Sequence, residues 1–238
     1  MEQPDPRLDL SRWVPDEFPP QGQWRALVRL AAAVRRTIDI LADTEADEAA
    51  LEAAAEQVEA VNARLSALPR GRRLWGFAES ATSGSPKAMF DNSPVIGLAN
   101  PVAPPLSLRV EDGRVVGTGT FGQAYEGPPG HVHGGWVAAA FDEVLGMAQT
   151  LSGRPGMTGT LTVRYRNPTP LHQQLRFEAW IERVEGRKIF ARGTLHAGDT
   201  LCAEAEGIFV SVDWERFRAL ADRRSPAPDA RGGSSGER

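Results

Sequence analysis

The sequence predicts an α+β fold in which an antiparallel sheet curves around one long buried helix, with a helical hairpin ahead of it. Residues 134–150 are apolar on almost every side, as in a helix enclosed by other elements. The stretches around them alternate apolar and polar residues and are joined by short turns. Nearer the N-terminus, apolar residues instead recur every three or four positions, which is typical of amphipathic helices.

The helical hairpin is expected over residues 22–68. Apolar residues follow helical spacing from Leu27 to Leu41 and again from Leu51 to Leu68. Thr44 with Asp47 resembles a capping signal ahead of the second helix. We expect the two helices to be antiparallel and to pack on the main domain or at a contact between subunits.

Three segments lack such periodicity. Residues 1–21 hold five prolines among mixed charges and are expected to form an extended arm. Residues 69–99, rich in Gly, Pro, Ser and Asn, are expected to form an irregular connector. Residues 213–238 are expected to form a short helix and a disordered tail. The main domain is therefore expected to cover residues 100–212.

Six strands are expected around the central helix of the main domain. Turns such as Glu185-Gly186-Arg187 join neighbouring strands directly, so no crossover helix is available for a parallel sheet. The arrangement is therefore two strands, the helix, then four strands. These expected strands are residues 106–110, 115–121, 158–166, 174–184, 188–196 and 201–212.

Composition excludes several classes of protein. A formal net charge of −4 without a dense Lys/Arg block argues against a nucleic-acid partner. The longest apolar stretch, Trp136 to Ala148, falls short of the roughly 20 residues that span a membrane. The acidic, proline-interrupted start does not resemble a secretory signal, and the single cysteine, Cys202, fits a reducing compartment. We expect a cytoplasmic protein without a membrane span.

A glycine-rich segment, Gly127 to Gly135, leads directly into the central helix. Free N–H groups at a helix N-terminus favour an oxygen that gains negative charge. In acyl transfer that oxygen is the thioester carbonyl, and one donor can lower the barrier by about 3 kcal/mol. Gly134 and Gly135 permit close approach, although they could serve only a tight turn. Trp136 could limit an acyl pocket or simply pack in the core.

Asp142 follows Gly135 by seven residues, two helical turns along a face of small side chains. A carboxylate enclosed there would have a raised pKa or would be tied to hydrogen-bond donors, and both are common at catalytic sites. Glu143 could instead be the inward acid, and Asp142 could be exposed at the helix surface. Spacing alone does not decide between them.

Two other kinds of chemistry are not favoured. His131 and His133 lie on one side of an extended segment, but no third ligand has suitable local spacing, so we expect no metal and no cofactor. The sequence has no Gly-x-Ser-x-Gly motif for a nucleophilic serine.

The order His133-Gly134-Gly135, then Asp142, resembles the signature of hotdog-fold thioesterases of the 4HBT superfamily, specifically the PaaI-like and THEM-type acyl-CoA thioesterases. Thr158, sixteen residues after Asp142, resembles the residue that supplies a catalytic hydroxyl in the THEM-type members. The similarity covers the main domain and leaves the helical hairpin unexplained.

The resemblance implies a hotdog fold and two protomers that pair their sheets, with active sites between them. It assigns Asp142 the role of general base or nucleophile and places Thr158 of the facing subunit beside the attacking water. The Gly135 N–H would polarise the thioester carbonyl, and His133 would orient the acyl group. We also expect Gly134 and Trp136 to contact the substrate.

The expected function is hydrolysis of an acyl-CoA thioester to free acid and CoA by a homodimer or a dimer of dimers. Two alternatives remain open, a hotdog protein that binds acyl-CoA without turnover and an assembly protein that uses the hairpin as its partner surface. A hotdog hydratase is disfavoured because its signature is not found.

Overall fold

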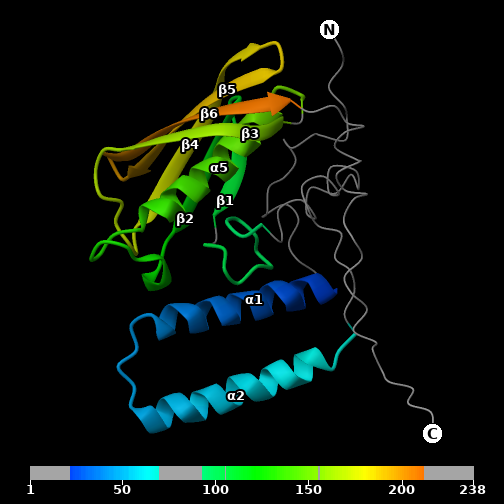
Figure 1. Cartoon of the computed structure of the whole chain (residues 1–238), viewed down its shortest axis with the longest axis vertical. Helices are drawn as coiled ribbons and strands as arrows, with labels where there is room; N and C mark the ends of the chain where they lie inside the picture. Colours follow the sequence, from blue (N-terminus) through cyan, green and yellow to red (C-terminus); the bar gives the residue numbers. More distant parts are fainter. Residues whose placement is uncertain (1–21, 70–92, 105, 155, 212–238) are drawn as a thin grey trace, which may run out of the picture.

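A computed structural model of the 238-residue chain (Figure 1) describes residues 22–69, 93–104, 106–154 and 156–211. The predicted N-terminal arm, the C-terminal segment and most of the connector lie outside the described residues. The helices are α1 (Gly22–Leu41), α2 (Glu48–Ser66) and α5 (Gly134–Thr150), with a 3-10 turn η3 (Gln123–Tyr125). The strands are β1 (Ser107–Glu111), β2 (Arg114–Thr120), β3 (Gly156–Tyr165), β4 (Gln174–Glu185), β5 (Lys188–Ala197) and β6 (Thr200–Ser211).

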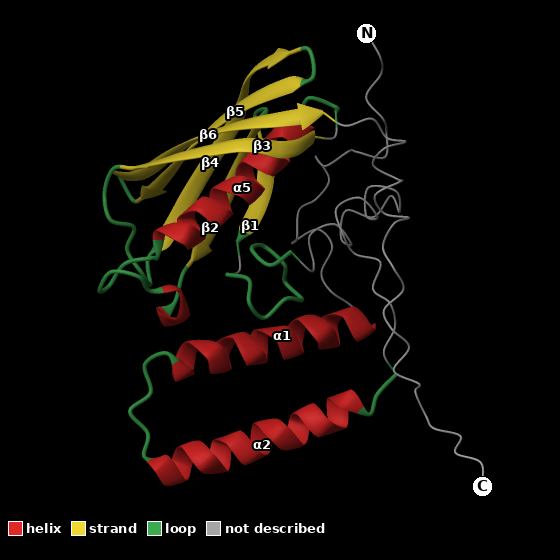
Figure 2. Ribbon diagram, viewed as in Figure 1, coloured by secondary structure: helices red, strands yellow, loops and turns green. Residues whose placement is uncertain are grey.

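The strands form one antiparallel six-stranded sheet in the order β1-β2-β4-β5-β6-β3. The sheet curves around α5, which crosses its concave face (Figure 2). The α+β architecture and the hotdog arrangement are therefore confirmed, with strand bounds close to those that the alternation predicted.

The core lies between α5 and the sheet. Phe141 of α5 meets Phe177 of β4 edge to face at 5.4 Å between ring centroids, and both are fully buried. Leu145 approaches the backbone where β5 carries Gly193, because a Cβ there would lie 3.4 Å from Leu145 Cδ2 and only 2.8 Å from Glu178 O. The bare backbone lets the helix lie close to the sheet, which fixes the positions of the side chains on its other faces.

Strand β3 is an edge of this sheet. It pairs with β6, and the register shifts between Thr158 and Thr160, so Gly159 is the extra residue of a bulge. Most β3 side chains are exposed. A ten-residue edge strand offers unpaired backbone N–H and C=O groups to another strand.

Helix α1 is tied to the sheet domain by polar contacts. Arg35 donates through Nε to Ala103 O and through Nη2 to Asn100 O, both at 2.7 Å. Asp39 Oδ1 accepts the Ala124 N–H at 3.1 Å, beside η3. The loop carbonyls and the helix are thus joined by charge-assisted hydrogen bonds.

Helix α2 runs antiparallel to α1 and has no buried residue, which confirms the predicted hairpin. Its N-cap is Asp47, whose Oδ1 accepts the Ala50 N–H at 2.8 Å. Thr44 of the predicted capping signal instead accepts the Ala46 N–H within the loop, at 3.4 Å. Among the described helices, none combines the length and apolar character needed to cross a membrane.

Candidate active site

The start of α5 is held by its own histidine. His133 is the N-cap, and its Nδ1 accepts the Gly135 N–H at 3.0 Å. The His133 N–H donates to Tyr125 O at 2.9 Å. A Cβ at Gly127 would lie 2.7 Å from His133 Cα, so a glycine is required where this part of the loop passes the helix start.

The amides of the two helical glycines differ. The Gly135 N–H, which the sequence predicted as the oxyanion donor, is engaged by His133 Nδ1. The Gly134 N–H, one position earlier, has no acceptor among the described residues. Tyr165 of β3 donates its hydroxyl to Gly134 O at 2.7 Å and thereby joins the helix start to the edge strand.

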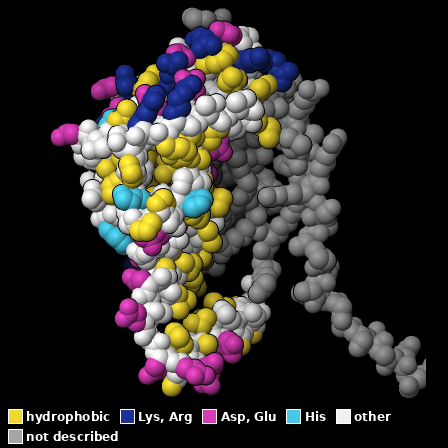
Figure 3. All heavy atoms as spheres, turned by 60° about the vertical axis from the view of Figure 1, so that its left-hand side comes forward, with side chains coloured by type: hydrophobic (Ala, Val, Ile, Leu, Met, Phe, Trp, Pro, Cys, Tyr) yellow, Lys and Arg dark blue, Asp and Glu magenta, His cyan; other side chains and the backbone are white. Residues whose placement is uncertain are grey.

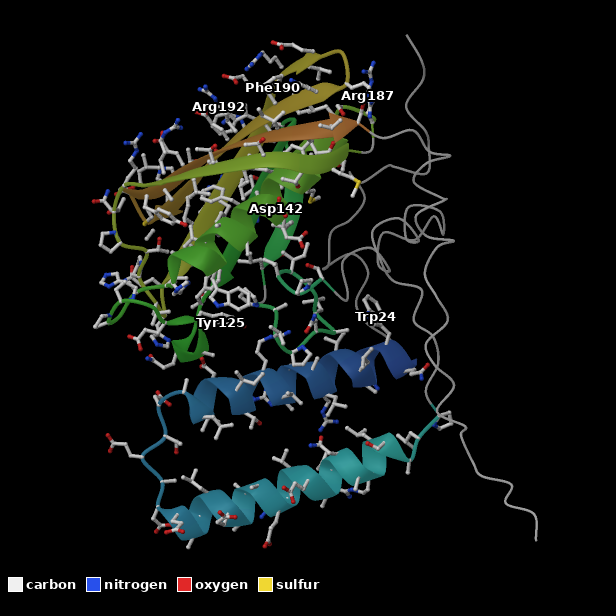
Figure 4. All side chains as sticks on the ribbon, viewed as in Figure 1. Trp24, Tyr125, Asp142, Arg187, Phe190 and Arg192 are labelled. Carbon is white, nitrogen blue, oxygen red and sulfur yellow. The ribbon has the colours of Figure 1, made fainter. Side chains whose placement is uncertain are left out.

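Aromatic side chains pack next to the start of α5. Trp136 packs edge to face on Tyr125 (labelled in Figure 4), with centroids 5.0 Å apart. The Tyr125 hydroxyl donates to Val102 O at 3.1 Å. Burial raises the pKa of Tyr125 to about 12, with Arg35 opposing that rise and Asp39 adding to it. The phenol therefore stays a donor. Trp136 is partly buried and packs against the core.

Asp142 and Thr158 are brought together within one chain. Thr158 Oγ1 donates to Asp142 Oδ1 at 2.8 Å, from the bulged start of β3 to the middle of α5. The resemblance placed Thr158 of the facing subunit beside the attacking water, whereas within one protomer Thr158 already lies beside Asp142. The strand that follows α5 returns along the same helix, so both side chains reach the same side of one protomer.

The predicted enclosure of Asp142 is not found within one chain. Its side chain is exposed, and Gly135, Ala138 and Ala139 on the same face are not buried either. The reason is that β3 is an edge strand, so nothing in the described part of the chain covers α5 beyond it. Small side chains along this open side leave room for another surface to approach closely.

Glu143 is the inward acid. Its Oε1 accepts the Ser93 hydroxyl at 2.6 Å, and Ser93 Oγ in turn accepts the N–H groups of Val95 and Ile96. Burial raises the pKa of Glu143; the Ser93 hydrogen bond opposes this, and the nearby Asp142 charge adds to it. Glu143 therefore anchors the connector on α5, while Asp142 is left with Thr158 on the open side.

Replacing Glu143 by glutamine should change how stability depends on pH. The folded-state pKa lies above the ordinary value of about 4.3, so the stability contributed by this group is complete below that pH and is lost as pH rises through the folded pKa. The glutamine amide does not titrate, and its oxygen can still accept from Ser93. Urea unfolding at several pH values should show the variant gaining stability relative to wild type as pH rises. A difference that is constant with pH would contradict this assignment.

The two histidines of the glycine-rich segment are used separately. His131 Nδ1 lies 2.8 Å from Pro129 O, whereas His133 Nδ1 caps α5. In the described ranges, no three His, Cys, Asp or Glu side chains gather as potential metal ligands.

Sequence reasoning did not single out Ser93, Tyr125 or Tyr165. A signal existed for Tyr165, because alternation in β3 places it on the same face as the partly buried Leu161 and Val163. No local pattern marks Ser93, whose partner lies fifty residues away in sequence.

Comparisons with known proteins agree with this fold. The model of the thioesterase superfamily (4HBT) matches residues 129–204. Acyl-coenzyme A thioesterase THEM4 of Xenopus laevis is 36% identical over 93 residues, 38% of this chain and 42% of that protein. Acyl-coenzyme A thioesterase THEM5 of Homo sapiens is 30% identical over 96 residues, 40% of this chain and 39% of that protein. The match spans about two fifths of the length of these two relatives.

A solved structure matches over more of the chain. The crystal structure of a thioesterase superfamily protein is 37% identical, with a TM-score of 0.70, and the match covers 80% of this chain and 97% of that one.

Proposed function

The chain belongs to the thioesterase superfamily, and from this premise we propose that it hydrolyses an acyl-CoA thioester to the free acid and CoA. The observation that carries the proposal is the Thr158 to Asp142 hydrogen bond on the open side of α5, on the same helix whose first N–H is free. A carboxylate positioned by a hydroxyl suits a general base, and a free amide at a helix start suits a developing oxyanion.

The proposed reaction begins with water bound to Asp142. Thr158 holds Oδ1, which leaves the other carboxylate oxygen free to accept a proton as the water oxygen attacks the thioester carbon. The carbonyl oxygen becomes an oxyanion at the start of an α5 helix. When it re-forms the carbonyl, the C–S bond breaks, and the departing CoA thiolate takes up the proton that Asp142 removed from the water. The products are the free acid and CoA, and the mechanism uses no cofactor.

Within one chain the helix start and Asp142 are separated along α5. Gly135 and Asp142 are seven residues apart on α5, or about 10 Å along its axis at 1.5 Å per residue. The attacking water and the oxyanion donor must both lie about 3 Å from the reacting group. We therefore propose that Asp142 of one copy works with the α5 start of the partner subunit.

The edge strand offers a route to that pairing. If two β3 strands pair across a two-fold axis, the sheets become continuous and the two α5 helices lie antiparallel on the same face. Asp142 of each copy then faces the other helix's start across the open, small-residue side of α5. This supports a homodimer, or a dimer of dimers, with catalytic centres between subunits.

The oxyanion donor in this proposal is an amide at the α5 start. The Gly134 N–H is available as it stands, whereas the predicted Gly135 N–H would have to be shared with His133 Nδ1. His133, exposed beside these glycines, is proposed to orient the acyl group. Gly134, which lacks a side chain, lets the substrate approach, and Trp136 is proposed to border the acyl group only through its uncovered edge.

The single cysteine supports an intracellular setting for this reaction. Cys202 is buried and unpaired, and burial raises the pKa of its thiol, so a nucleophilic thiolate is not expected there. We propose that the protein works in the cytoplasm, because a free, buried thiol suits a reducing compartment.

Release of free thiol from a panel of acyl-CoA esters tests the proposed activity. We expect turnover by the wild type and a roughly tenfold lower kcat for Thr158→Ala, since one hydrogen bond to a charged group contributes about 1.5 kcal/mol. Thr158→Ser keeps the hydroxyl and should recover most of the rate. Tight acyl-CoA binding without thiol release would favour the binding-only alternative, and a serine variant no better than alanine would remove the hydroxyl from the mechanism.

A further inference from the structure

We propose that the helical hairpin is a docking surface for a second copy of this chain, with two hairpins packing into a four-helix bundle. Here the hairpin means α1, α2 and the residues 42–47 that join them. It lies apart from β3, on the other side of the loop 93–104 (Figure 1). The inference is independent of the proposed chemistry.

Helix α1 uses only one of its faces against the sheet domain. That face contains Ala31, which is buried, together with Arg35 and Asp39, which bind the loop and η3. A different face carries Leu30, Val34, Ile38 and Leu41, which remain 37%, 39%, 38% and 59% exposed. This second face is apolar yet only partly covered.

Helix α2 carries a regular apolar seam. One row of its apolar residues has alternating spacings of three and four, which is the a/d pattern of helices that pack side by side. None of them is buried, and Val58 at the centre of the helix is 47% exposed. The seam consists of Leu51, Ala54, Val58, Val61 and Leu65.

Within one chain, the apolar faces of α1 and α2 remain partly exposed. Figure 3 shows hydrophobic side chains along the hairpin, with acidic side chains at its end. Exposed apolar patches of this kind mark interaction surfaces, and a surface helix draws most of its stability from burying an apolar face. A second hairpin laid across the first would cover both seams at once, as in bundles of four helices.

Charge identifies the occupant as another copy. Helix α1 carries a net charge of +3, from four arginines and one aspartate, and α2 carries −3, from four glutamates and one arginine. Among the described residues, the α2 glutamates form no ion pair.

The charges also set the arrangement of the bundle. In a two-fold bundle each α1 can lie between its own α2 and the α2 of the partner subunit, so every adjacent pair has opposite charge. Identical helices then lie on the diagonals, where like charges are far apart. A hairpin that is basic on one helix and acidic on the other is self-complementary in this arrangement.

The test uses the full chain with its β3 edge blocked. Thr160→Lys with Thr162→Lys places lysines on the exposed edge strand, a natural way to prevent strand pairing. The molar mass of this background, measured by sedimentation equilibrium, should be that of a dimer held by hairpins. Adding Val58→Asp and Leu65→Asp to the α2 seam should halve it. The matched control, Ala53→Asp with Ala60→Asp, adds the same charge to exposed positions off the seam and should stay dimeric.

A mixing experiment guards against simple unfolding of the hairpin. A chain with Val34→Lys and Ile38→Lys on α1 should be monomeric in the same background, like the seam variant. Mixed in equal amounts, the two should form a heterodimer, because the lysines of one meet the aspartates of the other. If the β3-blocked background is itself monomeric, the proposal is overturned. Another segment of the chain, or an unrelated protein, would then cover the seams. A seam variant that stays dimeric, or a mixture that stays monomeric, would overturn it as well.

Discussion

Replacing Asp142 by asparagine should lower kcat for acyl-CoA hydrolysis by a factor on the order of 10² to 10⁴. The amide is nearly the same size and can still accept the Thr158 hydroxyl, so the site should keep its shape. What the variant loses is the basicity that removes a proton from the attacking water. The measurement is free-thiol release under saturating acyl-CoA. KM should change little, because the proton transfer belongs to the transition state.

Glu143→Gln is the matched control, since it makes the same change on the neighbouring residue. Its carboxylate is occupied by Ser93 and buried under the connector, so the variant should retain most of its kcat. If Asp142→Asn kept full activity and Glu143→Gln were inactive, Glu143 and not Asp142 would be the general base. Equal thermal unfolding of the Asp142→Asn variant and the wild type would show that a rate loss is chemical.

Replacing Gly134 by proline should lower kcat about 10² to 10³-fold relative to Gly134→Ala. Proline removes the free N–H, yet the first position of a helix tolerates it because that N–H has no partner within the helix. The preceding residue, His133, has φ −59° and ψ 131°, a conformation compatible with a following proline. The alanine variant adds a comparable Cβ, 3.2 Å from the Tyr165 hydroxyl, and keeps the donor.

A parallel substitution separates the two glycines. Gly135→Pro removes the N–H that donates to the capping His133 Nδ1, so it should disturb the position of the histidine more than the stabilisation of the oxyanion. If this variant loses the rate and Gly134→Pro does not, the donor is the residue that the sequence first indicated. If neither loses the rate, the helix start has no part in stabilising the oxyanion.

Much of the fold could be predicted because its signals are local. The switch from helical to alternating spacing separates the hairpin from the sheet domain, and the all-round apolar run at 134–150 marks the central helix. The short turns between strands fix an antiparallel sheet. The capping residue of α2 was less certain, because Thr44 and Asp47 are both capping types, and only the backbone shows which one accepts the helical N–H.

The site was only partly predictable because its decisive contacts join distant residues. The family resemblance selected Asp142 over Glu143, but the sequence could not show that Ser93, fifty residues earlier, donates to the second acid. It could not show that His133 takes the Gly135 N–H, since that depends on a side-chain rotamer. Whether Asp142 is enclosed depends on a surface beyond the described chain, and periodicity within one chain carries no information about it.

The seven-residue interval between Gly135 and Asp142 has a consequence for when the protein can work. If the two groups act across a subunit boundary, as proposed, each newly made chain folds with half of two catalytic centres and no whole one. Turnover per chain would then depend on the fraction of chains that are paired. It would fall on dilution below the dissociation constant of the pair, although each chain stays folded. Hydrolytic activity would therefore rise more than proportionally with the concentration of the protein.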